Sequence, residues 1–129
     1  MKKIIYIFGN PLIESDSLPI KIASELRIKF PKFKFIIKDP NENLKPKDKS
    51  ITIIDTVLGI KKVTMLRDID LIENSGRFTM HDFDLGFNLK LLVKIGELDK
   101  DKIFIIGVPV GIEKEKAVEE IGKAMKNVK

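Results

Sequence analysis

Residues 1–17 read MKKIIYIFGNPLIESDS, and this stretch determines the fold that we expect for the chain. The run Lys3–Phe8 has the length of a strand and is almost wholly apolar, which is typical of a strand covered on both faces. Gly9 and Pro11 end the strand, and the acidic loop Glu14–Asp16 follows. In an open α/β sheet the loop after the first strand lies at the carboxyl edge, where such folds bind their ligands. We therefore expect a functional site at this loop.

The rest of the chain alternates between helical and strand patterns. A helix is predicted from about Leu18 to Lys29, because Pro19 suits the first helical turn and apolar residues recur at helical spacing. The later elements are predicted as strands at Phe33–Lys38, Ile51–Ile54 and Lys61–Leu66, a helix from about Asp84 or Leu85 to Glu97, a strand at Ile103–Val108 and a helix from about Lys114 to Asn127. In the helix that ends near Glu97 we expect six apolar residues to face inward: Leu85, Phe87, Leu89, Leu91, Leu92 and Ile95.

The order of these elements predicts an α/β fold. We expect a three-layer α/β/α sandwich with a mostly parallel five-stranded sheet, because helices alternate with most of the strands. The segment Lys61–Leu66 alternates only weakly and has charged residues at its ends, so it is predicted as an antiparallel edge strand. A length of 129 residues suits one domain, and we expect residues 1–129 to form a single α/β domain.

The composition excludes several classes of protein. The chain has no cysteine, which excludes disulfides, iron–sulfur clusters and thiol catalysis. Its apolar runs are too short for a transmembrane helix, and the first run ends at Phe8 without the cleavage site of a signal peptide. We therefore expect a cytoplasmic protein that does not bind a membrane.

The net charge of +5 raises the question of nucleic-acid binding. The lysines are spread along the chain, and the densest cluster, Lys45, Lys47 and Lys49, is interrupted by Pro46 and Asp48. Such a pattern is typical of a solvated lysine-rich surface. We expect no nucleic-acid partner, and we expect a monomer.

The familiar nucleophile and phosphate motifs are missing from the sequence. A single histidine and no Gly-x-Ser-x-Gly segment leave little basis for a serine hydrolase. There is no Gly-x-x-x-x-Gly-Lys-Ser/Thr loop, and Gly9 stands alone where a dinucleotide site needs three glycines. An anion site at the helix start near Pro19 stays open, although the acidic residues before it would repel a phosphate.

Two carboxylates and one imidazole form the remaining candidate site: Asp16, Asp55 and His81. Each residue comes from a different connection, and all three fit one edge of the sheet. Oxygen and imidazole donors suit a divalent ion such as nickel, zinc, manganese or iron(II), and three ligands leave positions open for substrate or water. The alternative is structural, because Asp is common at turns and a histidine before a helix is often a cap. Glu14 is a rival ligand to Asp16.

Four segments resemble motifs of the hydrogenase maturation proteases, a family of nickel-dependent endopeptidases. GNPLIESD (9–16) resembles the family's Gly-Asn-x-Leu-x-x-Asp-Asp/Glu loop and implies that Asp16 is a metal ligand. ITIIDTV (51–57) resembles its Ile-Ile-x-Asp-Ala strand end and implies the same for Asp55. TMHDFDLGFNLKLL (79–92) resembles its His-containing segment before a helix and implies His81 as the third ligand. IFIIGVPVGIE (103–113) is similar to its final strand.

The resemblance implies an endopeptidase that removes the C-terminal extension of a nickel–iron hydrogenase large-subunit precursor after nickel insertion. The metal would be the nickel that the substrate supplies, and Asp16, Asp55 and His81 would complete its coordination. Asn10 and Gly9 are candidates for binding the substrate backbone, and a turn cap is the other role open to Asn10. Asp82 would cap the following helix or orient His81.

One departure from the family leaves alternatives open. The family's Asp-Gly-Gly-Thr loop after the second strand is replaced here by Asp39–Glu42. The chain is therefore also compatible with a non-proteolytic relative, which would act as a metal-dependent binding or assembly module in hydrogenase maturation. A small nucleotide-binding domain that uses the turn at Gly9 is a third, weaker hypothesis.

Overall fold

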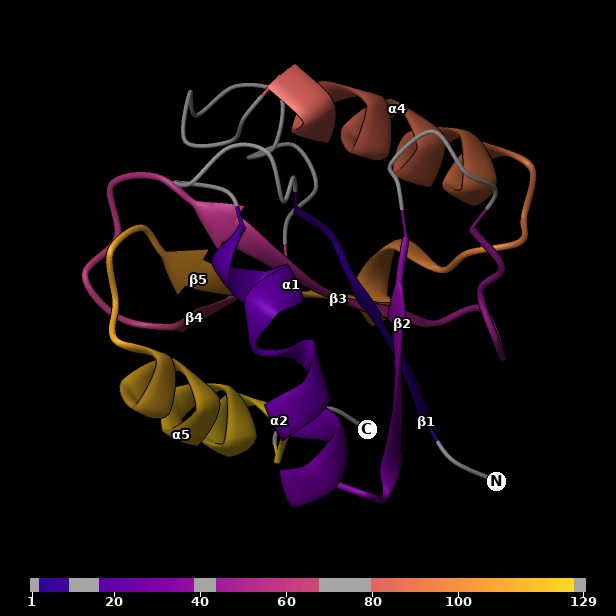
Figure 1. Cartoon of the computed structure of the whole chain (residues 1–129). Helices are drawn as coiled ribbons and strands as arrows, with labels where there is room; N and C mark the ends of the chain where they lie inside the picture. Colours follow the sequence, from indigo (N-terminus) through magenta and orange to yellow (C-terminus); the bar gives the residue numbers. More distant parts are fainter. Residues whose placement is uncertain (1–2, 10–16, 39–43, 68–79, 127–129) are drawn as a thin grey trace.

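The computed structural model of the chain has a five-stranded sheet with helices on both faces (Figure 1). The structure describes residues 3–9, 17–38, 44–67 and 80–126, with the backbone alone for residues 80–85. No helix in these ranges combines the length and the hydropathy needed to cross a membrane.

The sheet is mostly parallel, as the order of elements predicts. Its strands are β1 (Lys3–Ile7), β2 (Phe33–Ile37), β3 (Ile51–Val57), β4 (Thr64–Leu66) and β5 (Ile103–Pro109), in the spatial order β2-β1-β3-β5-β4. The first three neighbouring pairs are parallel, and β4 pairs with β5 in the antiparallel sense at one edge. The predicted antiparallel edge strand is therefore confirmed, and β3 occupies the centre of the sheet.

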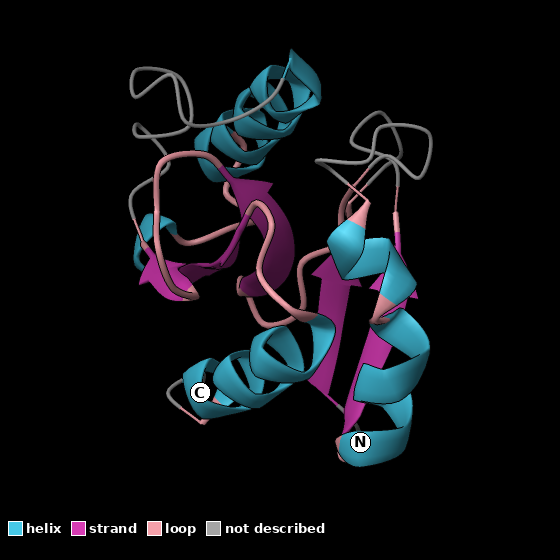
Figure 2. Ribbon diagram, turned by 60° about the vertical axis from the view of Figure 1, so that its left-hand side comes forward, coloured by secondary structure: helices cyan, strands magenta, loops and turns pink. Residues whose placement is uncertain are grey.

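The helices form the two outer layers. They are α1 (Leu18–Lys21), α2 (Ala23–Lys29), α4 (Met80–Lys94) and α5 (Lys114–Met125), with a short 3-10 turn, η2, at Lys100–Lys102. Figure 2 shows the strands lying between helices on opposite sides. The predicted first helix has the expected ends, but a turn at Ile22 divides it into α1 and α2. The three-layer α/β/α sandwich is confirmed.

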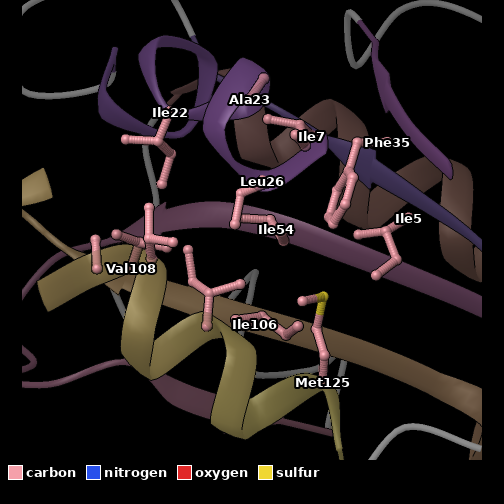
Figure 3. Packing of buried hydrophobic residues seen from close by; sticks show 13 residues of the cluster. Ile5, Ile7, Ile22, Ala23, Leu26, Phe35, Ile54, Ile106, Val108 and Met125 are labelled. Atoms are coloured by element: carbon pink, nitrogen blue, oxygen red, sulfur yellow. The ribbon is translucent and has the colours of Figure 1, made fainter. Parts of the chain in front are cut away.

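Alternating residues of the strands build a separate apolar layer on each face of the sheet. On one face, Ile5, Ile7, Ile54 and Ile106 pack against α2 and α5 through residues such as Leu26 and Met125 (Figure 3). On the other face, Tyr6, Phe8, Ile53, Val57 and Ile105 pack with Leu89 of α4. This alternation follows from the two-residue period of a strand. It fixes which face each side chain of β3 points to.

Helix α4 differs from the sequence prediction in two ways, its bounds and its inner face, and it ends at Lys94, three residues before the predicted end at Glu97. It begins at Met80, not at Asp84 or Leu85, because residues 80–84 contain no Pro or Gly that would stop a helix. Asp82 therefore lies inside the helix, and its predicted role as the cap that precedes the helix is wrong.

The second difference concerns the inner face of α4. Leu89 is fully buried and Leu92 packs against the core, as predicted. Phe87, Leu91 and Ile95 are exposed, and their predicted inward orientation is wrong. A helix that covers a sheet from one side has a single inner stripe, so apolar residues at other angles remain in solvent.

Candidate functional site

The candidate site is built around Asp55, a carboxylate in the central strand. All seven residues of β3 are buried, because strands flank it on both sides and helices cover both faces. Asp55 is the fifth of these residues and is only 1% exposed. An ionised carboxylate at such a position is costly unless it is paired, hydrogen-bonded or bound to a cation. The packing of β3 therefore does not by itself require an ionisable side chain at position 55.

The side chain of Asp55 lies on the face of the sheet that α4 covers. Asp55 alternates with Ile53 and Val57, which both belong to the apolar cluster that includes Leu89 of α4. Ile54, by contrast, packs with α2 and α5 on the opposite face. The carboxylate therefore points toward the layer that contains α4.

A backbone hydrogen bond orients the Asp55 carboxylate. The Thr56 N–H donates to Asp55 Oδ1 at 2.9 Å. A hydrogen bond to an ionised acceptor is stronger than one between neutral groups, so this contact favours one orientation of the carboxylate.

The neighbours of Asp55 within the sheet differ strongly in size. On the β1 side the Phe8 N–H donates to the Ile54 carbonyl oxygen at 2.9 Å, which places Phe8 beside this part of β3. On the β5 side Asp55 is in register with Gly107. A Cβ added at Gly107 would lie 2.7 Å from Val57 Cγ2. Glycine is therefore needed at this position for Val57 to pack beside Asp55.

The two described ends of the acidic loop lie near β3. Gly9 follows Phe8 at the carboxyl end of β1, which pairs with β3. Ser17 is 1% exposed and immediately precedes α1, a helix that contacts β3. The predicted site residues Asn10 and Asp16, and the rival ligand Glu14, lie outside the described residues.

The backbone of His81 belongs to the first turn of α4. That helix covers the face on which Asp55 lies, and Figure 1 draws its first turn on the same side of the molecule as the arrowhead of β3. The His81 side chain is outside the described part of the structure. Among the side chains that are described, no group of three or more His, Asp or Glu residues is close enough to hold a metal ion. The structure therefore describes the side chain of Asp55, and it describes the backbone of the helix that carries His81.

Two buried threonines of β3 were not predicted as part of the site. Thr52 and Thr56 are 1% and 2% exposed, and their Oγ1 atoms have no hydrogen-bond partner within the part of the chain that the structure describes. By alternation they lie on the face opposite Asp55. Threonine is common in strands for its branched shape, so the sequence carries no signal that these hydroxyls are buried.

Comparison with solved structures finds two proteins with this fold. The hydrogenase maturating endopeptidase HybD from E. coli matches with a TM-score of 0.64 and 18% identity, over 96% of this chain and 88% of that one. An uncharacterized protein from Wolinella succinogenes matches with a TM-score of 0.53 and 15% identity, over 98% of this chain and 94% of that one. At these identities the likeness establishes the fold.

Comparisons at the level of sequence give no match. No protein-family model matches the chain, and no curated protein matches it. The chain is thus an α/β protein with the fold of HybD, and its activity has to be argued from its own residues.

Proposed function

We propose that the chain is a metal-dependent endopeptidase that removes the C-terminal extension of a nickel–iron hydrogenase large-subunit precursor after nickel insertion. The observation that carries the proposal is the buried, oriented carboxylate of Asp55 near the carboxyl end of the central strand. Parallel α/β sheets bind their ligands at this edge. The fold shared with HybD, an endopeptidase of hydrogenase maturation, supports the same assignment.

The proposed ligands are Asp16, Asp55 and His81, and the ion is the nickel that arrives with the substrate. Two carboxylates and an imidazole are donors that suit a divalent ion of this kind. A nickel ion held there would supply Lewis-acid chemistry at the scissile carbonyl or at a bound water. Asp55 is the proposed ligand whose side chain the structure describes, and its burial and its hydrogen bond from the Thr56 N–H support this role.

The substrate backbone is proposed to lie against Gly9 and Asn10. Gly9 is partly buried just beyond the carboxyl end of β1, the strand that pairs with β3. A residue without a side chain lets another backbone approach closely, which suits an extended peptide. Asp82 is proposed to orient His81, since both residues belong to the first turn of α4.

Substitution of the three proposed ligands tests this function. We expect Asp16→Asn, Asp55→Asn and His81→Ala each to lower processing of nickel-loaded precursor by at least about 100-fold, because each removes a donor to the ion that activates the carbonyl. The matched control is Asp101→Asn. Asp101 is exposed and precedes the amino end of β5, whereas Asp55 lies near the carboxyl end of the parallel strand β3. Its rate should equal that of the wild type.

The readout is the mass of the precursor over time, with circular dichroism to verify that each variant is folded. Processing at the wild-type rate by all three ligand variants would contradict the proposal. A wild-type chain that binds the nickel-loaded precursor and leaves it uncut would instead support the alternative, a metal-dependent binding or assembly module.

A further inference from the structure

Gly107 is the neighbour of Asp55 on β5, and it has no side chain to fill its place on the sheet. The two residues are in register across the parallel pair of β3 and β5, so their side-chain positions lie on the same face. That face is the one that α4 covers, because Asp55 alternates with Ile53 and Val57. The space beside Asp55 on the β5 side must therefore be filled from another position.

The side chain of Val57 fills that space. A Cβ placed on Gly107 would lie 2.7 Å from Val57 Cγ2 and 3.3 Å from Val57 Cβ, with Ile60 Cδ1 at 3.4 Å. Val57 is fully buried, and a β-branched side chain has little freedom at χ1. Val57 therefore has no low-cost way to make room for a side chain at position 107.

The position of Val57 is coupled to the Asp55 carboxylate through the backbone between them. Only Thr56 separates the two residues, and its N–H donates to Asp55 Oδ1 at 2.9 Å. A strand has two soft dihedral angles per residue, so a displacement of Val57 also moves the Thr56 peptide that holds the carboxylate. The ladder to β5 continues through Val57, which limits how far β3 can move aside as a whole.

We propose that Gly107 is a positioning residue for Asp55. Its missing side chain lets Val57 pack against the backbone of β5, and this contact holds the Asp55 carboxylate in the orientation from which it binds the ion. The inference rests on the proposed function, because it assigns a role in the same site. Gly107 has no side-chain donor of its own, so it acts through Val57 and the backbone of β3.

Gly107→Ala tests this role with two readouts. We expect processing of nickel-loaded precursor to fall by at least about tenfold, because a small misplacement of a group that positions the reacting atoms is costly. We also expect the ¹³C resonance of the Asp55 carboxyl carbon, measured on the metal-free chain at fixed pH, to move from its wild-type value. The second readout needs neither nickel nor precursor.

The double variant Gly107→Ala with Val57→Ala separates positioning from the effect of the added methyl group. A Cβ at position 107 lies 3.3 Å from the Cβ at position 57, so the new methyl replaces the contact that Val57 Cγ2 makes in the wild type. We expect the two changes to be non-additive, with processing within about threefold of the wild type and the carbon resonance near its wild-type value. A resonance that responded only to the methyl at position 107 would stay shifted.

The matched control is Gly122→Ala, which adds the same methyl group in an equally tight place. Gly122 lies in α5, and a Cβ there would lie 2.5 Å from Phe30 Cζ. Helix α5 packs on the face of the sheet opposite Asp55. This variant shares the packing defect but is remote from the site, so processing should stay within about twofold of the wild type and the Asp55 resonance should not move.

Thermal melts verify that each variant is folded. If Gly107→Ala does not fold, Val57→Ala takes its place, because it removes the same contact and adds no atom. The Asp55 carbon resonance should then move, and processing should fall by at least about threefold. A wild-type resonance in folded Val57→Ala would contradict the positioning role.

Three results with folded Gly107→Ala would also overturn the positioning role. They are a wild-type carbon resonance or wild-type processing in Gly107→Ala, an equal loss of processing in Gly122→Ala, and a double variant as impaired as Gly107→Ala. The proposed peptidase is judged separately, by whether the wild-type chain shortens nickel-loaded precursor. If it does not, the peptidase is refuted, and the carbon resonance alone decides whether Gly107 positions Asp55.

Discussion

At the scale of single residues, Asp55 combines two properties that seldom occur together, an ionisable side chain and nearly complete burial. Burying a carboxylate costs several kcal/mol before its partners compensate. The hydrogen bond that Asp55 accepts from the Thr56 N–H, at 2.9 Å, offsets part of that desolvation cost. Groups placed in this way are often retained for function at the expense of stability.

Asp55→Asn separates function from stability at this position. The amide oxygen keeps an acceptor for the Thr56 N–H and removes the buried charge, so we expect the free energy of unfolding to change by less than about 1 kcal/mol while processing is lost. Urea unfolding at neutral pH, followed by circular dichroism, measures the first quantity. A loss of more than about 3 kcal/mol would mean that Asp55 belongs to a structural ion pair.

The sequence was informative about the backbone position of Asp55 and less so about its surroundings. An aspartate directly after the predicted strand Ile51–Ile54 predicts a strand-end carboxylate, and the structure has Asp55 on β3, two residues before its end. The need for glycine at position 107 depends on the Val57 side chain, from a strand distant in sequence. Contacts of this kind arise only when the sheet has formed, so a linear pattern does not contain them.

At the scale of elements, α5 packs against the chain at the end of α2 through a glycine. Gly122 is buried, and a Cβ added there would lie 2.5 Å from Cζ and 2.9 Å from Cε1 of Phe30. The ring of Phe30 thus fills the space that a side chain at position 122 would need. Close packing between helices explains a helix-weakening residue in the middle of α5.

Gly122→Ala tests this packing because two effects oppose each other. Helix propensity alone would stabilise the variant by about 1 kcal/mol. Overlap with Phe30 would cost about 1–3 kcal/mol, so we expect a net loss of up to about 2 kcal/mol in unfolding free energy. Denaturant unfolding measures the change.

The control for Gly122→Ala is the same substitution combined with Phe30→Leu. A smaller side chain at position 30 should reduce the penalty, so the two changes should be non-additive. An increase in stability for Gly122→Ala alone would show that the ring moves aside without cost.

Strands were easier to predict from the sequence than helix faces. The apolar runs of β1, β3 and β5 are bounded by turn or charged residues, and their predicted ends agree with the structure within three residues. In α4, leucines and other apolar residues occur at almost every helical angle, so periodicity does not select the inner face. The prediction that Phe87, Leu91 and Ile95 face inward failed for this reason.

At the scale of the whole molecule, the fold brings distant segments to one edge of the sheet. Gly9 follows β1 by two residues, Asp55 lies near the end of β3, and α4 begins with His81 in its first turn. The order of predicted elements was sufficient for the three layers and the parallel sheet. The geometry of the loops could not be predicted from the sequence, because loops lack the periodicity that predicts helices and strands.

The most direct test of the central claim is the intact mass of a nickel–iron hydrogenase large-subunit precursor after incubation with the chain. We predict that nickel-loaded precursor is split into a mature subunit and one C-terminal peptide, whose masses sum to that of the precursor plus one water. Nickel-free precursor, and nickel-loaded precursor given the Asp55→Asn chain, should keep their masses. An unchanged mass for nickel-loaded precursor at equimolar wild-type chain would contradict the account.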